Sequence, residues 1–156
     1  MTNLSDTPFG RNQVRAALKL WHTPHQLGEH ALASQPFVDP HGKDGRGLVL
    51  REVLRRGIEA LRPDGTPDFG DKHWRPYLIL TEQFIAQRKP EIIAGQLGLV
   101  RGSFHHEQAH ALDLLAGWLA CSLSSALAAR GSRWAAGGAA GTRRSCRRTS
   151  RRCRWR

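Results

Sequence analysis

Apolar residues return every three or four positions through most of the first 119 residues of the chain. This spacing predicts amphipathic helices over about 11–22, 48–61 and 76–88. No segment shows the sustained alternation of apolar and polar residues that indicates a strand. The pattern therefore predicts an all-α protein, a small helical bundle. The apolar positions that define the three helices are Val14, Ala17, Leu18, Trp21, Leu50, Val53, Leu54, Ile58, Leu61, Tyr77, Leu80, Phe84 and Ile85.

Prolines and glycines separate these helices. Pro24 is expected to open a short helix, because proline is favoured at the first helical position. Residues 34–47 are rich in proline and glycine and predict a loop. The turn-rich segment 63–73 predicts a linker between an N-terminal helical module, 1–62, and a second module, 74–119.

Two motifs overlap in residues 90–110, and the first is a helix-turn-helix. Ala94 supplies a small residue where two helices would cross, and Gly98 tolerates the positive φ of a tight turn. A second helix then opens at Arg101. The predicted helix over 76–88 is the supporting helix, so the sequence predicts a C-terminal trihelical helix-turn-helix. The apolar positions expected between these helices are Ile93, Leu97, Leu99 and Phe104.

The second helix is expected to continue to about residue 119, with Leu112 buried together with Phe104 beneath Ala94 and Gly98. Its opposite face, at about 100° per residue, faces either solvent or the major groove of DNA. The apolar stripe comprises Ala111, Leu112, Leu115, Trp118 and Leu119, and the opposite face carries His106, His110 and Asp113.

The other motif is H-E-x-x-H, formed by residues 106–110, which occurs in zinc peptidases. A catalytic zinc takes three protein ligands and a water, but this pattern supplies only two. Asp113 and Ala116 stand where the extended motif has glycine and histidine, and no His, Asp or Glu follows Asp113. We therefore expect no metal site, no cofactor and no catalytic residues. Adventitious metal binding by His106 and His110 is expected in preference to catalysis, and a zinc metallopeptidase is a remote alternative.

Charge is concentrated at the C-terminal end of the chain. The formal net charge is +11, yet residues 130–156 contain ten arginines and no acid, so residues 1–129 are nearly neutral. The segment 120–156 is rich in Arg, Ala and Gly and lacks an apolar periodicity, which predicts a disordered basic tail.

The composition of this tail has two interpretations. A basic arm that holds phosphate is one; translation of a GC-rich gene out of frame is the other, and a downstream domain is then missing. The cysteines Cys121, Cys146 and Cys153 fit no zinc motif. Residues 1–10 do not resemble a signal peptide, and the sequence lacks the stretch of about 18 apolar residues needed to span a membrane. We therefore expect a cytoplasmic protein with no membrane partner.

The segment 74–119 resembles the helix-turn-helix of bacterial sigma-factor region four and of related response regulators. The resemblance rests on Leu78-Ile79-Leu80, Phe84-Ile85, Pro90-Glu91-Ile92-Ile93-Ala94, Leu97-Gly98-Leu99, Arg101, Phe104, Glu107 and Ala111-Leu112. More faintly, residues 11–119 resemble the N-terminal segment of large multidomain bacterial regulators.

This resemblance implies a DNA-binding transcriptional regulator, or a fragment of a larger one, and not an enzyme. In the family, side chains at the start of the second helix reach base edges. By position these are Arg101, Gly102, Ser103, His105 and His106. Val100 stands where the family has a Ser or Thr cap, so a degenerate helix-turn-helix that docks to a protein partner is the alternative.

Overall fold

The computed structural model describes residues 9–35 and 42–134, and within these ranges the chain is helical without a strand. The predicted all-α fold is therefore confirmed. In chain order the elements are α1 (Arg11–Lys19), α2 (Pro24–Glu29), the 3₁₀ helix η2 (Ala31–Ser34), α3 (Gly42–Ala60), the 3₁₀ helix η3 (Lys72–Trp74), α4 (Arg75–Leu80), the π-helical turn η4 (Thr81–Ile85), α5 (Pro90–Gln96) and α6 (Arg101–Trp134).

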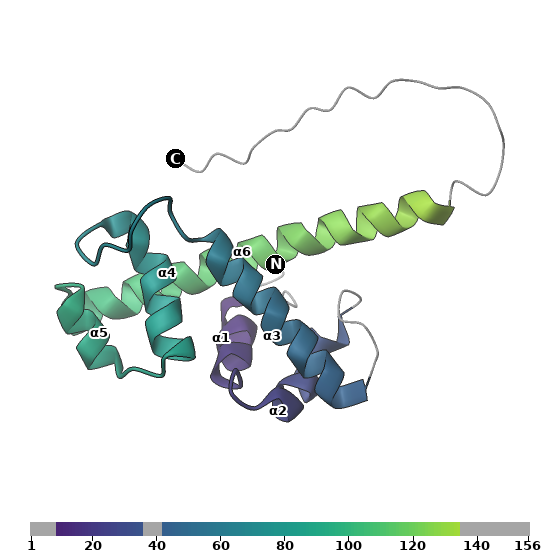
Figure 1. The fold of residues 1–156 in the computed structure, drawn as a ribbon, viewed down its shortest axis with the longest axis horizontal. Coiled ribbons are helices and arrows are strands. Elements are labelled where there is room, and N and C mark those ends of the chain that lie inside the picture. The colour runs from purple at the N-terminus through teal and green to yellow at the C-terminus, as the bar shows by residue number, and fades with distance from the viewer. Residues whose placement is uncertain (1–8, 36–41, 135–156) are drawn as a thin grey trace, which may run out of the picture.

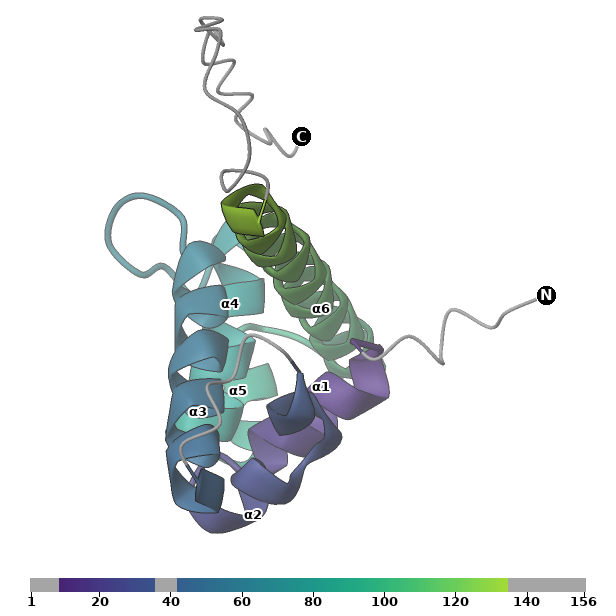
Figure 2. The same ribbon diagram turned by 90° about the vertical axis from the view of Figure 1, so that its right-hand side faces the viewer.

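The longest helix, α6, forms the axis against which the others are arranged (Figures 1 and 2). Helices α4 and α5 lie around its N-terminal end, while α1 and α3 pack farther along it. The short helix α2 packs mainly on α3. The C-terminal part of α6 extends beyond the rest of the molecule (Figure 1).

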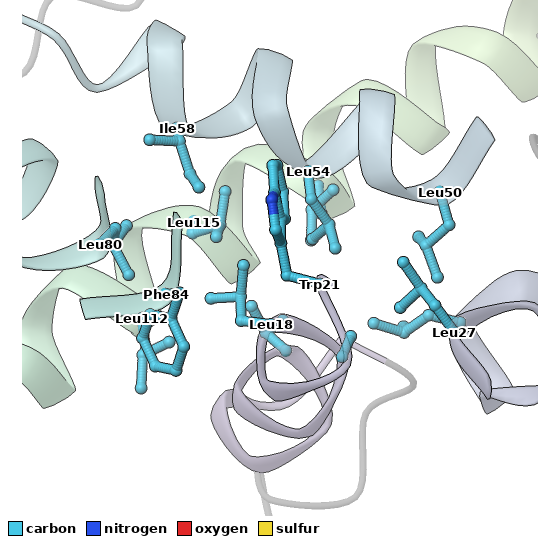
Figure 3. Close-up of a cluster of buried hydrophobic side chains, with 14 of the residues drawn as sticks. Leu18, Trp21, Leu27, Leu50, Leu54, Ile58, Leu80, Phe84, Leu112 and Leu115 are labelled. Carbon is cyan, nitrogen blue, oxygen red and sulfur yellow. The ribbon is translucent and has the colours of Figure 1, made fainter. Parts of the chain in front are cut away.

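The larger of two apolar clusters, which we call the first cluster, joins the N-terminal helices to the second half of the chain. Leu18 and Trp21 from the α1 segment meet Leu54 of α3 and Leu115 of α6 in its centre (Figure 3). The buried members are Val14, Ala17, Leu18, Trp21, Leu27, Leu32, Ala33, Leu50, Leu54, Ile58, Leu80, Phe84, Ala111, Leu112, Leu115 and Leu119. Burial of this apolar area from water is the main favourable contribution to folding.

The second cluster fastens the start of α6 to α4 and α5. Its buried members are Trp74, Leu78, Ile79, Ile93, Ala94, Leu97 and Phe104. Helix α6 therefore serves both clusters, with Phe104 in the second and Leu112 in the first. The first cluster includes side chains from both of the predicted modules, 1–62 and 74–119.

Helix α3 begins earlier than the sequence predicts. It starts at Gly42, inside the segment 34–47 predicted as a loop, whereas residues 36–41 lie outside the described residues. This added part of α3 packs closely on α2: a Cβ built on Gly47 would lie 1.8 Å from the carbonyl oxygen of Pro24. Gly47 therefore allows the backbones of α2 and α3 to approach closely. The sequence pattern alone treated this glycine as a loop residue, because it does not show which helix lies opposite.

The predicted helix over 76–88 is interrupted in its second half. After α4 the backbone widens into the π-helical turn η4, in which the amide of Ala86 donates to the carbonyl of Thr81 at 2.9 Å. Gln87 then adopts a φ of +54°, and the amide of Arg88 donates to the carbonyl of Glu82 at 2.9 Å. The helix thus ends at Ile85, because a residue in the left-handed region terminates helical hydrogen bonding.

Helix α6 continues past residue 120, into the segment predicted as tail. Residues 120–134 are mostly Ala, Ser and Leu, with one glycine and no proline, which allows a helix to continue. The hydroxyls of Ser124 and Ser125 donate to the carbonyls of Ala120 and Cys121, both at 3.1 Å. The rest of the predicted tail, 135–156, lies outside the described residues.

His30 gives the fold a dependence on pH. Its Nδ1 accepts a hydrogen bond from the amide of Leu32 at 3.2 Å and caps η2. Burial lowers the pKa of His30 below its ordinary value of 6.5. The unfolded chain therefore takes up this proton at a higher pH than the folded chain does. The stability contributed by the neutral imidazole of His30 is present above its ordinary pKa. It is lost as the pH falls through the lower pKa of the folded state.

We therefore expect the wild-type protein to lose more stability than His30→Asn when the pH is lowered from about 7.5 to about 5.5. Asparagine keeps an acceptor at the capping position but does not titrate. Urea unfolding of both proteins at the two pH values measures the difference. Equal losses in the two proteins would contradict this role of His30.

Candidate nucleic-acid interface

The turn between α5 and α6 is closed by two backbone hydrogen bonds around Gly98. The φ of Gly98 is +63°, in the left-handed region that glycine adopts without steric cost. The amide of Leu99 donates to the carbonyl of Ala94 at 2.8 Å, and the amide of Gly98 donates to that of Gly95 at 3.2 Å. These bonds form a Schellman motif, which satisfies carbonyls at the end of a helix. The positive φ predicted for Gly98 is confirmed.

The second cluster holds the start of α6 against the two preceding helices. Phe104 is 1% exposed and packs with Ile93 and Leu97, while Ala94 is buried in the same cluster. Leu99 is partly buried against it. The predicted packing positions of the helix-turn-helix therefore lie together in one apolar cluster, and this fixes the orientation of the first turns of α6.

Leu112 is buried as predicted, but in a different place. The sequence placed it beside Phe104 under the turn, whereas it packs in the first cluster with Leu80 and Phe84 (Figure 3). The prediction of its position was wrong because eight residues of an α-helix span about 12 Å. Two side chains on one stripe at that separation reach different neighbours.

The five residues predicted to meet DNA share one property, exposure to solvent. They occupy the first two turns of α6, and only Phe104 among their immediate neighbours in the helix is buried there. The start of α6 thus presents an exposed surface to solvent, while Phe104 alone among these residues is buried. The exposed residues are Arg101, Gly102, Ser103, His105 and His106.

The next two residues of α6 turn toward α4 instead. Glu107 accepts a hydrogen bond from Nη1 of Arg75 at 3.2 Å, and both side chains are largely buried, at 26% and 15% exposure. Gln108, which is buried, donates to Oε1 of Gln83 in η4. Among described residues the Nε of Arg75 has no hydrogen-bond partner. At Glu107 and Gln108, α6 therefore contacts the preceding helical segment through polar groups. The charge of Glu107 is neutralised within the protein.

This arrangement also describes the H-E-x-x-H motif. His106 and His110 are exposed on the outer face of α6, whereas the carboxylate of Glu107 is held by Arg75 against α4. The described part of the chain contains no group of three or more His, Cys, Asp or Glu side chains placed to hold a metal ion. Of the three motif side chains, only the imidazoles of His106 and His110 lie on the exposed face of α6.

One turn beyond His110, the outer face of α6 meets α1. Asp113 accepts two hydrogen bonds from Arg11, one of them from Nε at 2.8 Å. This hydrogen bonding raises the pKa of Arg11 above its ordinary value. Helix α1 therefore borders the outer face of α6 at Asp113, and the surface open to a partner is the portion from Arg101 to His110.

Several exposed residues near the turn were not predicted as contacts, and Lys89, Val100 and Ile92 are the ones suited to bind a partner. Lys89 is exposed and precedes Pro90, the first residue of α5; a lysine followed by a proline at a helix start is the signal that marks it. Val100 and Ile92 are large apolar side chains with exposures of 73% and 52%. Their exposure has no signal in the sequence, because an apolar residue at a helix start is equally compatible with burial.

Comparison of the chain with protein families, with curated proteins and with solved structures found no match. Of the helices in the described ranges, none combines the length and the apolar character needed to cross a membrane.

Proposed function

We propose that this protein is a DNA-binding transcriptional regulator, or part of one, in which the first turns of α6 enter the major groove. One observation carries the proposal. A Schellman turn at Gly98 leads into a helix whose residues 101–106 are all exposed except Phe104, which anchors them to α4 and α5. Helix-turn-helix proteins contact base edges with the N-terminal residues of their second helix.

The charges near the turn favour an anionic partner at short range. The N-terminus of a helix carries a partial positive charge, and Arg101 adds a full positive charge at that end of α6. Lys89 adds another before the start of α5, although the exposed Glu91 in the first turn of α5 opposes it. The carboxylate of Glu107, which would oppose phosphate, is paired with Arg75. Backbone amides at helix starts bind phosphate for the same electrostatic reason.

Each exposed residue has a role suited to its chemistry. Arg101 pairs with a guanine or a phosphate, since its guanidinium matches the two acceptors of guanine. Ser103 donates to a phosphate or a base, and His105 and His106 line the groove. Gly102 lets the backbone of α6 approach the DNA closely, because it has no side chain.

Substitution of Arg101 by alanine tests the proposal. In a chain truncated after Trp134, we expect the wild-type protein to enrich a preferred site from random DNA. Arg101→Ala should reduce its preference for that site over unrelated DNA by roughly 1–3 kcal/mol, the value of a bidentate base contact. The truncation removes most of the arginines of residues 130–156, which would hold any DNA at low salt.

Arg15→Ala is the matched control, because Arg15 is an exposed arginine of α1. Both substitutions remove one positive charge, but only Arg101→Ala should change the sequence preference. If the wild-type truncated chain enriches no site at all, or if both variants weaken binding equally for every sequence, base recognition by Arg101 is refuted.

A protein-docking module is the second candidate, and the apolar exposure beside the turn favours it. Val100 and Ile92 are both more than half exposed, and apolar side chains at such positions become buried when a protein partner binds. Val100→Ser and Ile92→Ser separate the two functions. DNA selection should be retained in both variants if α6 reads bases, whereas binding to a protein partner should weaken.

A further inference from the structure

Two histidines on the outer face of α6 are placed to act together. His106 and His110 are both exposed and lie in one uninterrupted helix, four residues apart. Side chains at this spacing are neighbours on a helix surface, with about 5–6 Å between their Cβ atoms. This separation lets two imidazoles reach the same metal ion, as the two histidines of H-E-x-x-H motifs do.

The helix beneath the pair is held firmly, which limits the entropy lost when both rings bind one ion. Glu107 is tied to Arg75, Gln108 is bonded to Gln83, and Ala111 is fully buried. These contacts lie on the inner face of α6 and leave the outer face free.

Neither ring of the pair is engaged elsewhere: no described residue holds the imidazole of His106 or His110 by a hydrogen bond or an ion pair. His105 differs, because its ring packs edge-to-face on Phe104 with the centroids 6.0 Å apart. It also points about 100° away from His106 around the helix. His105 is therefore a natural control for the pair.

We propose that His106 and His110 chelate one divalent transition-metal ion of the Zn²⁺, Ni²⁺ and Cu²⁺ group, with water in the remaining coordination positions. Imidazole nitrogen is a preferred ligand of these ions, whereas Mg²⁺ and Ca²⁺ prefer oxygen. Asp113, three residues after His110, is not a third ligand, because Arg11 holds both of its carboxylate oxygens and the described residues place no three such ligands together. With only two protein ligands the ion exchanges readily and is not required for folding.

This site is distinct from that of a zinc peptidase, because Glu107 is paired with Arg75 and is not available as a general base. His106 also belongs to the proposed DNA contact. The ion is titrated in the absence of DNA, however, so failure of one proposal leaves the other standing.

Calorimetric titration with Ni²⁺ tests the proposal on the full-length chain without a histidine tag. The three cysteines are alkylated first, so that thiolates do not compete for the ion. We expect one Ni²⁺ site that is weakened at least about tenfold in His106→Ala and in His110→Ala, because loss of one ring removes the chelate. In His105→Ala the affinity should stay within about twofold of the wild type.

Thermal melting supplies a second measurement. Ni²⁺ should raise the melting temperature of the wild type and of His105→Ala, because an ion that binds only the folded state stabilises it. It should have a smaller effect on His106→Ala and His110→Ala, both of which fold without metal since each exchanges one exposed side chain. Equal Ni²⁺ affinity in all four proteins, or a loss in His105→Ala as large as in the other two variants, would overturn the proposal.

Discussion

Replacing Gly47 with alanine is expected to destabilise the protein by about 3 kcal/mol or more, the upper end of the range for overpacked cores. A Cβ at this position would lie 1.8 Å from the carbonyl oxygen of Pro24 and 3.0 Å from the amide nitrogen of Gly28. Both are backbone atoms, so the clash cannot be relieved by rotating a side chain. Helices α2 and α3 have to move apart, and Leu27 and Leu50 in the first cluster then lose their packing.

The measurement is thermal and urea unfolding of the variant beside two other glycine substitutions. Gly117→Ala is the matched control, because Gly117 lies inside α6 with nothing within 4 Å of its Cβ position; it should stabilise the helix by up to about 1 kcal/mol. Gly57→Ala should fall between them, since its Cβ would meet the side-chain tips of Leu115 and Trp118. If Gly47→Ala unfolds at the same temperature as Gly117→Ala, the close approach of α2 and α3 is contradicted.

Phe104→Ala is expected to cost about 3–5 kcal/mol, as removal of a buried aromatic ring usually does. Phe104 is 1% exposed and, among the described side chains of α6, is the only one in the second cluster. Without its ring, α5 and the first turns of α6 lose their common anchor. Urea unfolding should show a lower midpoint, and hydrogen exchange should show the amides of α5 losing protection first.

His105→Ala is the control for this substitution, because the neighbouring side chain is exposed and its removal should change stability by no more than about 0.5 kcal/mol. Phe104→Leu should lie between the two, since leucine keeps part of the apolar contact. If Phe104→Ala and His105→Ala unfold at the same urea concentration, Phe104 is not the anchor of the turn.

The periodicity of the sequence was sufficient to predict most of the buried face of each helix. Val14, Leu18 and Leu54 are buried where helical spacing placed them, because that spacing records which side of a helix faces the core. Gly98 was predicted for a comparable reason, since its positive φ is a local requirement of the turn.

Features that depend on contacts between residues far apart in the sequence could not be predicted from periodicity. Gly47 was predicted to lie in a loop, whereas it lies in α3 against the backbone of Pro24 in α2. The ion pair of Arg75 with Glu107 joins residues 32 positions apart. The π-helical turn at Thr81 widens the backbone without changing the apolar spacing enough to be noticed. For the candidate interface, the exposure of Arg101 followed from the pattern, whereas the exposure of Val100 did not.

The sharing of α6 between two clusters limits how the molecule can be divided. A fragment cut to residues 74–119 would keep the turn at Gly98 but would leave uncovered a row of apolar side chains that α1 and α3 normally shield. That row consists of Leu80, Phe84, Ala111, Leu112, Leu115 and Leu119. A surface of this kind promotes self-association. An isolated fragment of residues 74–119 should therefore aggregate. A chimeric protein that receives the helix-turn-helix needs α1 and α3 as well.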